Sequence, residues 1–414
     1  MRRSTPHVLG CVAETNLYRT MLTAPDTWRG VNVNFRGLRN YAPHRLSAGM
    51  ARMRGARAAH YRRLIAPPLK RPAVVALSPQ MAAIADRLVA TWPRGVPTDL
   101  LPLTEHLMQE MAIGLLFGDD RERAMPIAKM ITLQATATRL IPGRDYLAWV
   151  RIAARQERAI MEWAEQKRGN VDAKDILSIL VNNPDEFGAP PSREIIGGLL
   201  SFIFGAAFET CQNGLAWTLI LLSQHPQIAA GLADEINAAL RGEAPTIERV
   251  EALPLLDAVV NEGLRLLPPV PLQFRKSLVP TTLGGVDVPP STRVLISAYL
   301  INRNPAMYDD PDRFRPERWR GLNPSPFEYT VFGAGSRMCP GSVFANQVAK
   351  IGLSAILSRF RIEMVRNARI DYRNRITLAP YPTVPIILRD VADVPIAVPI
   401  TGGIHKLVNL ARAA

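Results

Sequence analysis

Apolar residues recur at helical spacing through the middle of the chain and predict several long helices. The stretch 101–117 is apolar turn after turn and stops at a Gly-Asp-Asp sequence. Residues 146–167 alternate Trp, Ile and Ala with charged residues, as an amphipathic helix does. Another apolar helix is expected over 343–360.

The longest apolar segment begins after Ser192 and runs to Leu222, before Pro226 ends it. About 30 helical residues span ~45 Å, enough to cross a whole domain. A helix that is apolar on all sides must be buried on all sides, which favours one large domain. Its longest apolar run, 195–208, is 14 residues long. That is short of the ~20 residues that span a bilayer, so we expect no transmembrane segment.

Alternating patterns predict a few short strands. They lie at 7–12, 281–288, 293–298 and, interrupted by proline, at 376–388. The expected fold class is therefore mainly α with a minor β region, in a single domain over 1–414. The segment 390–414 has no assignment: a disordered tail is the favoured interpretation, and a flap near a substrate entrance is the alternative.

Composition and charge narrow the function. Apolar residues make up 48% of the chain, which excludes a disordered protein. The formal charge is +14, and the segment 29–71 holds eleven Lys/Arg and no acidic residue. A nucleic-acid binder is one interpretation. Only seven of the 50 basic residues are Lys, however, and Arg also suits buried carboxylate or phosphate partners.

The three cysteines, Cys11, Cys211 and Cys339, are too few for a disulfide framework in 414 residues. A reducing compartment fits best, and no apolar segment of a signal peptide follows the first residues. We therefore expect a cytoplasmic protein.

Two polar residues interrupt the long apolar helix: Glu209 and Thr210 follow small residues and Phe208. Burying an acid and a hydroxyl is costly unless both are paired. One interpretation is a Thr bonded back to the preceding turn beside a solvent-facing Glu. The other is a groove where small residues admit a ligand that Thr210 meets.

A second polar pair lies among apolar residues: Glu262 and Arg265 share one helix face at i,i+3 spacing. At the surface such a pair contributes little to stability. The apolar neighbours make a buried pair plausible, and a buried pair needs further hydrogen bonds.

The segment 332–341, F-G-A-G-S-R-M-C-P-G, places Cys339 among three glycines and just before an apolar helix. A thiolate at a helix N-terminus is stabilised by the free amides there. Glycines also let the backbone approach a flat ligand closely. An inert structural cysteine would not require this glycine spacing.

Together these motifs resemble the cytochrome P450 family of haem-thiolate monooxygenases. Glu209-Thr210 resembles the acid–Thr pair of the central helix, and Glu262-x-x-Arg265 the E-x-x-R motif. Residues 314–319, F-R-P-E-R-W, resemble the P-E-R-F segment with Trp in place of Phe. The Cys339 loop matches every signature position, and the motifs occur in the family's order.

The resemblance implies a cofactor and its ligands. Haem b would bind through Cys339 as axial thiolate, with Arg337, Arg275 and Arg62 on the propionates. His60 is an open candidate for the same role, because the family often has His four residues before this Arg and Ala58 stands there. Glu262, Arg265 and Arg318 would form a buried structural network. Further haem contacts are expected at Phe332, Ala206, Gly341 and Val270.

The resemblance also implies the reaction. Thr210, with Glu209 behind it, would relay protons while one oxygen atom of O₂ enters a lipophilic small molecule. Terpenoids, fatty acids and aromatic metabolites are all candidate substrates. Electrons would come from a separate ferredoxin or flavodoxin with its reductase, facing the surplus Arg of 29–71. The alternative is another haem-thiolate reaction: peroxygenation, oxidative coupling or dehydration. A nucleic-acid partner is not expected, since it leaves the Cys339 loop unexplained.

The substrate pocket is expected between four segments. They are 34–54, 132–147, 202–208 and 270–274, and they are mostly apolar with several Arg at the edges.

Overall fold

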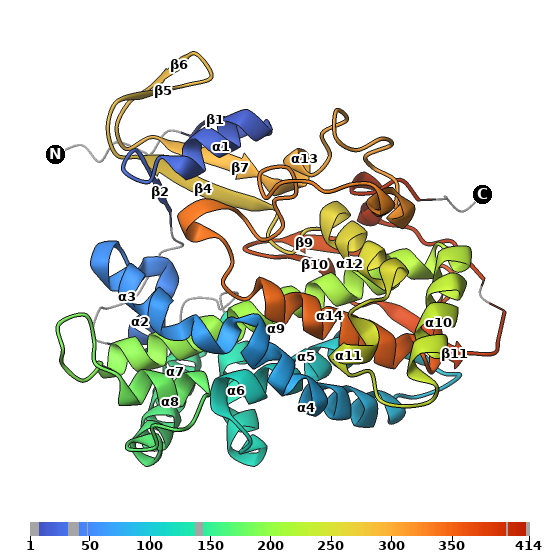
Figure 1. The fold of residues 1–414 in the computed structure, drawn as a ribbon, viewed down its shortest axis with the longest axis horizontal. Coiled ribbons are helices and arrows are strands. Elements are labelled where there is room, and N and C mark those ends of the chain that lie inside the picture. The colour runs from blue at the N-terminus through green and yellow to red at the C-terminus, as the bar shows by residue number, and fades with distance from the viewer. Residues whose placement is uncertain (1–7, 32–40, 48, 137–143, 395, 411–414) are drawn as a thin grey trace.

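Helices dominate the computed structural model, which describes residues 8–31, 41–47, 49–136, 144–394 and 396–410 (Figure 1). The predicted helices at 101–117, 146–167 and 343–360 are confirmed, although the last ends three residues early because a strand begins at Phe360. The helices are α1 (Thr15–Thr23), α2 (Ala42–Leu46), α3 (Gly55–Ile65), α4 (Arg71–Ala90), α5 (Leu100–Phe117), α6 (Arg121–Thr136), α7 (Arg144–Lys167), α8 (Ile176–Asn182), α9 (Arg193–Ser223), α10 (Pro226–Leu240), α11 (Ile247–Val250), α12 (Pro254–Leu266), α13 (Ala298–Ile301) and α14 (Ser342–Leu357).

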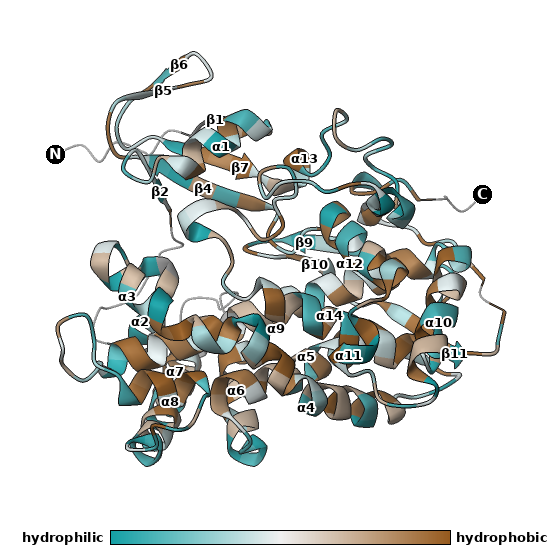
Figure 2. Ribbon diagram, viewed as in Figure 1, coloured by the Kyte–Doolittle hydropathy of each residue, from teal (hydrophilic) through white to brown (hydrophobic). Residues whose placement is uncertain are grey.

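Helix α9 is the long apolar helix that the sequence predicts, and it crosses the helical part of the molecule (Figure 1). The hydroxyl of Ser192 accepts a hydrogen bond from the Ile195 amide at 3.3 Å and caps the first turn. Helices α5, α12 and α14 pack against α9, so most of its side chains are buried in one apolar core. Figure 2 shows the apolar residues gathered along these central helices, with polar residues outside.

The strands form small sheets beside the helices. The largest has the order β1-β7-β4-β2, with β1 parallel to β7 and the other pairs antiparallel. Its apolar side, including Trp28 and Ile296, packs with Tyr18 and Met21 of α1 in a second core. The strands are β1 (Val8–Val12), β2 (Trp28–Gly30), β3 (Pro97–Asp99), β4 (Leu272–Ser277), β5 (Thr281–Leu283), β6 (Val286–Val288), β7 (Arg293–Ser297), β8 (Phe360–Met364), β9 (Asp371–Asn374), β10 (Leu378–Tyr381) and β11 (Pro385–Asp390).

The segment 281–288 is a hairpin rather than one strand. Strands β5 and β6 pair antiparallel, and the turn between them is Gly284-Gly285, with φ of 58° and 78°. Two consecutive residues at positive φ reverse the chain tightly, and glycine adopts that conformation without strain. The alternating side chains that indicated one strand therefore belong to two.

Residues 398–410 pack against the rest of the chain, so the disordered-tail interpretation is wrong for them. Ile400 and Ile404 are fully buried, and the Ile370 amide donates to Thr401 O at 2.8 Å. The buried Arg303 donates to Leu407 O at 2.7 Å, and Tyr299 Oη donates to the same oxygen at 2.8 Å. Ile400, Ile404 and Leu407 are four and three residues apart and are buried against the core. The segment is short and mostly irregular, so its apolar residues form no periodic pattern that the sequence alone would reveal.

Two helices of the described chain, α4 and α9, are long and apolar enough to cross a membrane by length and composition alone. Helix α9 packs against other helices along its length, as the core helix of a globular protein does.

Candidate functional site

Cys339 lies at the end of a tight loop that leads into α14. Its amide donates to Phe332 O at 2.7 Å, which closes the loop. Gly333 and Gly335 both adopt positive φ, at 68° and 67°. A Cβ on Gly335 would lie 2.8 Å from Leu22 O, so no side chain fits there. The glycine spacing of the motif thus has a local steric cause.

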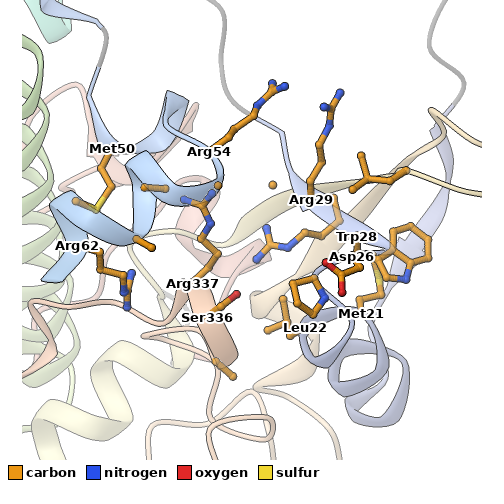
Figure 3. Close-up of a pocket in the computed structure, with 18 of the residues that line it drawn as sticks. Met21, Leu22, Asp26, Trp28, Arg29, Met50, Arg54, Arg62, Ser336 and Arg337 are labelled. Carbon is orange, nitrogen blue, oxygen red and sulfur yellow. The ribbon is translucent and has the colours of Figure 1, made fainter. Parts of the chain in front are cut away.

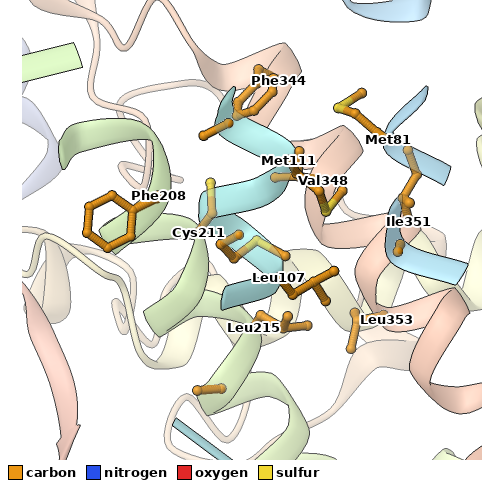
Figure 4. Close-up of a cluster of buried hydrophobic side chains, with 14 of the residues drawn as sticks. Met81, Leu107, Met111, Phe208, Cys211, Leu215, Phe344, Val348, Ile351 and Leu353 are labelled. Atoms are coloured by element: carbon orange, nitrogen blue, oxygen red, sulfur yellow. The ribbon is translucent and has the colours of Figure 1, made fainter. Parts of the chain in front are cut away.

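The two cysteines near this loop differ in what they can bind. Burial raises the pKa of the Cys339 thiol, while the Gly341 amide and the Arg62 charge lower it in part. Burial raises the pKa of Cys211 to about 12. Cys211 points among buried apolar side chains such as Leu215 and Met111 (Figure 4). Cys339 is therefore the better ligand, because a metal ion displaces the thiol proton of an amide-supported sulfur more easily.

An apolar cavity of about 260 Å³ separates α9 from the Cys339 loop. Thr210 and Cys339 line it from opposite elements, and Val270 lines it after the end of α12. Gly214 lets α12 pack closely against α9 at this cavity, because a Cβ there would lie 2.8 Å from Leu264 Cδ2. The other expected contacts on this cavity are Ala206, Phe332 and Arg337, whereas Gly341 lies next to it, with a built Cβ 4.0 Å from the Cys339 sulfur.

A larger cavity of about 800 Å³ adjoins the first at Arg337 and is lined by arginines (Figure 3). Three of them have backbone carbonyl partners. Arg337 donates to Met53 O at 3.3 Å, Arg275 to Phe274 O at 3.2 Å, and Arg62 to Met338 O. The arginines on this cavity are Arg29, Arg54, Arg62, Arg63, Arg275 and Arg337.

One carboxylate of the described chain, Asp26, also lines this cavity, but it forms no ion pair with this cluster of arginines. None of Arg62, Arg275 and Arg337 forms an ion pair with a described carboxylate. Burial lowers the pKa of Arg275 and of Arg337, and the charge of Arg337 lowers that of Arg275 further. Arg275 is buried, whereas Arg62 is half-buried and Arg337 is exposed at the mouth of the cavity. Cations that lie together and repel one another call for an anionic partner.

His60 lies away from this cluster. Its Nε2 is 3.0 Å from Pro184 O, and its ring meets Tyr61 edge-on. Two residues along a helix turn through about 200°, so His60 and Arg62 face opposite sides of α3. Ala58, one turn before Arg62, does line the cavity with it.

The acid and the hydroxyl of α9 have different partners. Thr210 Oγ1 donates to Ala206 O at 2.7 Å, which is the hydrogen bond to the preceding turn expected of a structural threonine. Thr210 also lines the cavity, as expected of a residue that meets a ligand. Glu209 is not left to solvent: its Oε1 accepts a hydrogen bond from Thr377 Oγ1 at 2.7 Å. Thr377 precedes β10, and nothing in the sequence pattern pointed to it.

Glu262 is fully buried and accepts five hydrogen bonds. Arg265 donates two at 2.8 and 2.9 Å, the Arg315 amide one at 2.9 Å, and Arg318 one at 3.0 Å. Trp319 Nε1 donates the fifth at 2.9 Å, so the aromatic residue that departs from the family pattern is a member of the network. Burial raises the pKa of Glu262, but these donors and cations outweigh it and hold the pKa below its ordinary value.

The donor set fits haem. The Cys339 thiol lines the apolar cavity of about 260 Å³. The adjoining larger cavity is lined by arginines that have no carboxylate partner in the described chain. A macrocycle with two carboxylates would supply the anions that Arg62, Arg275 and Arg337 lack. The described groups offer no cluster of three His, Cys, Asp or Glu for a bare metal ion, so a single thiolate ligand is the option they present.

Comparison with known proteins identifies the class. Residues 29–386 match the cytochrome P450 family model, so the chain belongs to that family. Cyclooctat-9-en-7-ol 5-monooxygenase of Streptomyces melanosporofaciens is 28% identical over 365 residues, 82% of this chain and 79% of that protein. Pentalenene oxygenase of Streptomyces avermitilis is 32% identical over 209 residues, 50% of this chain and 46% of that one.

The fold agrees with this assignment. The structure of retinoic acid-bound cyanobacterial CYP120A1 matches with a TM-score of 0.79 at 21% identity, over 92% of this chain and 88% of that one. The protein is a P450 monooxygenase, an oxidoreductase that binds haem through a cysteine thiolate and oxygenates lipophilic small molecules.

Proposed function

We propose that this monooxygenase hydroxylates or epoxidises a terpenoid-like hydrocarbon. The observation that carries the proposal is the pair of relatives whose names state cyclooctat-9-en-7-ol and pentalenene oxidation. The described walls agree in character: Phe202 and Phe274 are exposed large apolar residues in two of the four expected segments. Parts of those segments, 34–40, 48 and 137–143, lie outside the described residues.

We assign the roles at the site as follows. Cys339 is the axial ligand, and Arg62, Arg275 and Arg337 bind the propionates. Haem held by a thiolate supplies dioxygen activation and hydrogen abstraction when bound. Thr210 lines the cavity with a hydroxyl that can exchange its Ala206 partner for the reacting oxygen and hand on a proton. Glu209, the next carboxyl along α9, restores that proton.

The substrate proposal is tested by a spectral-shift screen. Terpenoid hydrocarbons, fatty acids and aromatic compounds of matched size are titrated into the haem-loaded enzyme. We expect the terpenoids to displace the sixth ligand and shift the Soret band at the lowest concentrations. Tighter binding of a fatty acid or an aromatic compound would reject this substrate class.

The proton role is tested by Thr210→Ala. The variant should keep haem and substrate affinity but divert electrons from product to peroxide. Unchanged coupling would remove Thr210 from the relay and favour another haem-thiolate reaction.

We further propose that a separate acidic ferredoxin or flavodoxin supplies the electrons in the cytoplasm, and that the chain forms one haem domain. Two exposed cations on the Arg-lined cavity, Arg54 and Arg63, support an acidic partner. Charge at such a surface chiefly accelerates association. Reduction by an acidic ferredoxin should therefore slow steeply with added salt, and a salt-independent rate would count against this partner.

A further inference from the structure

A second carboxylate lies behind Glu209. Glu105 is on α5, which packs along α9 (Figure 1). Gln212 Nε2 of α9 lies 3.4 Å from Leu101 O of α5. Leu101 is one turn before Glu105, and Gln212 is three residues after Glu209. The two acids therefore lie on neighbouring turns of two packed helices.

Glu105 is half-buried and held in place. Gln109 Nε2 donates to its Oε1 at 3.0 Å, and the same nitrogen donates to Thr132 Oγ1 of α6 at 2.9 Å. Gln109 itself is buried, so this contact fixes one carboxylate oxygen from inside the protein. The remaining exposed part of Glu105 gives it access to solvent protons.

Burial, and to a smaller extent the charge of Glu209, raise the pKa of Glu105. The groups that face it are Gln109 on its own helix, Glu209 from α9 and, through Gln109, Thr132 from α6. Burial raises the pKa of Glu105, the Gln109 hydrogen bond lowers it in part, and the negative charge of Glu209 raises it again. Within the described chain neither carboxylate forms an ion pair, so the repulsion between them is not relieved there.

We propose that Glu105 is a positioning residue that supplies protons to Glu209. The Glu105 carboxyl gives its proton through water to the Glu209 carboxylate and takes another from solvent. Only O–H bonds break and form, and no electron moves. Like charges on the two packed helices disfavour ionisation of both carboxyls at once, so the pair tends to hold one proton that can pass between them.

Thr377 completes the arrangement. Its hydroxyl holds the other side of the relay by donating to Glu209 Oε1. It belongs to the loop between β9 and β10, where Ile376 is exposed. Glu209 is thus held by Thr377 of this loop on one side, and Glu105 of α5 interacts with it electrostatically from the other helix. The inference rests on the proposed role of Glu209 as the proton donor to Thr210.

The first test measures titration, not activity. In the haem-loaded enzyme, the infrared absorption of the protonated Glu105 carboxyl is followed with pH and assigned by its loss in Glu105→Gln. We expect the Glu105 pKa above the ordinary ~4.3 and a fall toward that value in Glu209→Gln. Glu122→Gln, which removes one exposed charge from neighbouring α6, is the matched control and should change nothing. A Glu105 titration that ignores Glu209→Gln would overturn the inference.

The second test measures coupling. Glu105→Gln should lower the product formed per electron, increasingly so as pH rises, and Glu105→Asp should restore part of it. Substrate affinity and the CO spectrum should stay as in the unsubstituted enzyme. A pH-independent loss, or no loss, would reject proton supply by Glu105. Unchanged coupling in Glu209→Gln would instead reject the proposed function of Glu209, while the titration linkage between the two acids would remain.

Discussion

Removing the charge of Glu262 should destabilise the protein far more than removing that of a matched surface glutamate. Glu262 and Arg265 are both fully buried, and Arg318 beside them is nearly so. Glu262→Gln keeps the side-chain shape but leaves two guanidinium groups facing a neutral amide. Loss of one partner from a buried ion pair costs about 3–5 kcal/mol. With a urea slope of ~3 kcal/mol per M, the unfolding midpoint should fall by about 1–2 M.

The chain contains its own control for this experiment. Glu165 and Arg168 have the same i,i+3 spacing and the same two-bond geometry, with both distances at 3.0 Å. Their side chains are 68% and 43% exposed, whereas Glu262 and Arg265 are at 0%. Water screens the surface pair, so Glu165→Gln should leave the midpoint essentially unchanged.

The assay is urea unfolding of the haem-loaded variants at equal haem occupancy, followed by circular dichroism. Equal midpoints for Glu262→Gln and Glu165→Gln would refute the reasoning, because burial would then not decide the contribution of a Glu–Arg pair. Trp319→Phe extends the test. It removes one of the five donors and should cost about 1.5–3 kcal/mol, but much less in the Glu262→Gln background.

Three further outcomes follow from the contacts at the site. The pKa of Glu262 is lower in the folded than in the unfolded chain, so the stability that its ionised form gives the fold is complete above pH ~4.3 and is lost as pH falls through the folded pKa. The difference in unfolding midpoint between Glu262→Gln and the unsubstituted enzyme should therefore shrink on acidification, and a constant difference would contradict this. Arg275→Gln should release haem to a scavenger protein about ten- to a hundredfold faster, from a lost charged hydrogen bond of ~1.5–3 kcal/mol, while His60→Ala should release it at the normal rate; equal effects would refute the placement of His60. Cys211→Ala should keep the thiolate-type CO spectrum, since its buried thiol is no ligand, and loss of that spectrum would oppose the assignment.

The helical part of the fold could be predicted because its pattern is local. Long apolar segments with helical spacing and caps, such as the serine before α9, specify an element by themselves. The sequence pattern predicts one strand in place of the hairpin β5–β6, because alternation along a chain does not show where the chain reverses. The sequence pattern does not predict the packing of 398–410, because that packing depends on distant partners, Arg303 and Tyr299 among them.

The site divides in the same way. Cys339 and the Glu262–Arg265 pair lie in short contiguous motifs, so their residue types and spacing can be recognised from the sequence alone. Thr377 meets Glu209 across 168 positions, and no local pattern announces such a contact. His60 lies away from the arginine cluster for a geometric reason: a two-residue offset on α3 turns a side chain to the other side of the helix.

The central claim is that Cys339 holds haem as an axial thiolate. The most direct measurement is the absorption spectrum of the reduced enzyme with carbon monoxide, for the natural chain and for Cys339→Ala. We expect the strongly red-shifted Soret band of thiolate ligation in the natural chain and its absence in the variant. An unshifted band in the natural chain, or a red-shifted band that persists in Cys339→Ala, would contradict the claim.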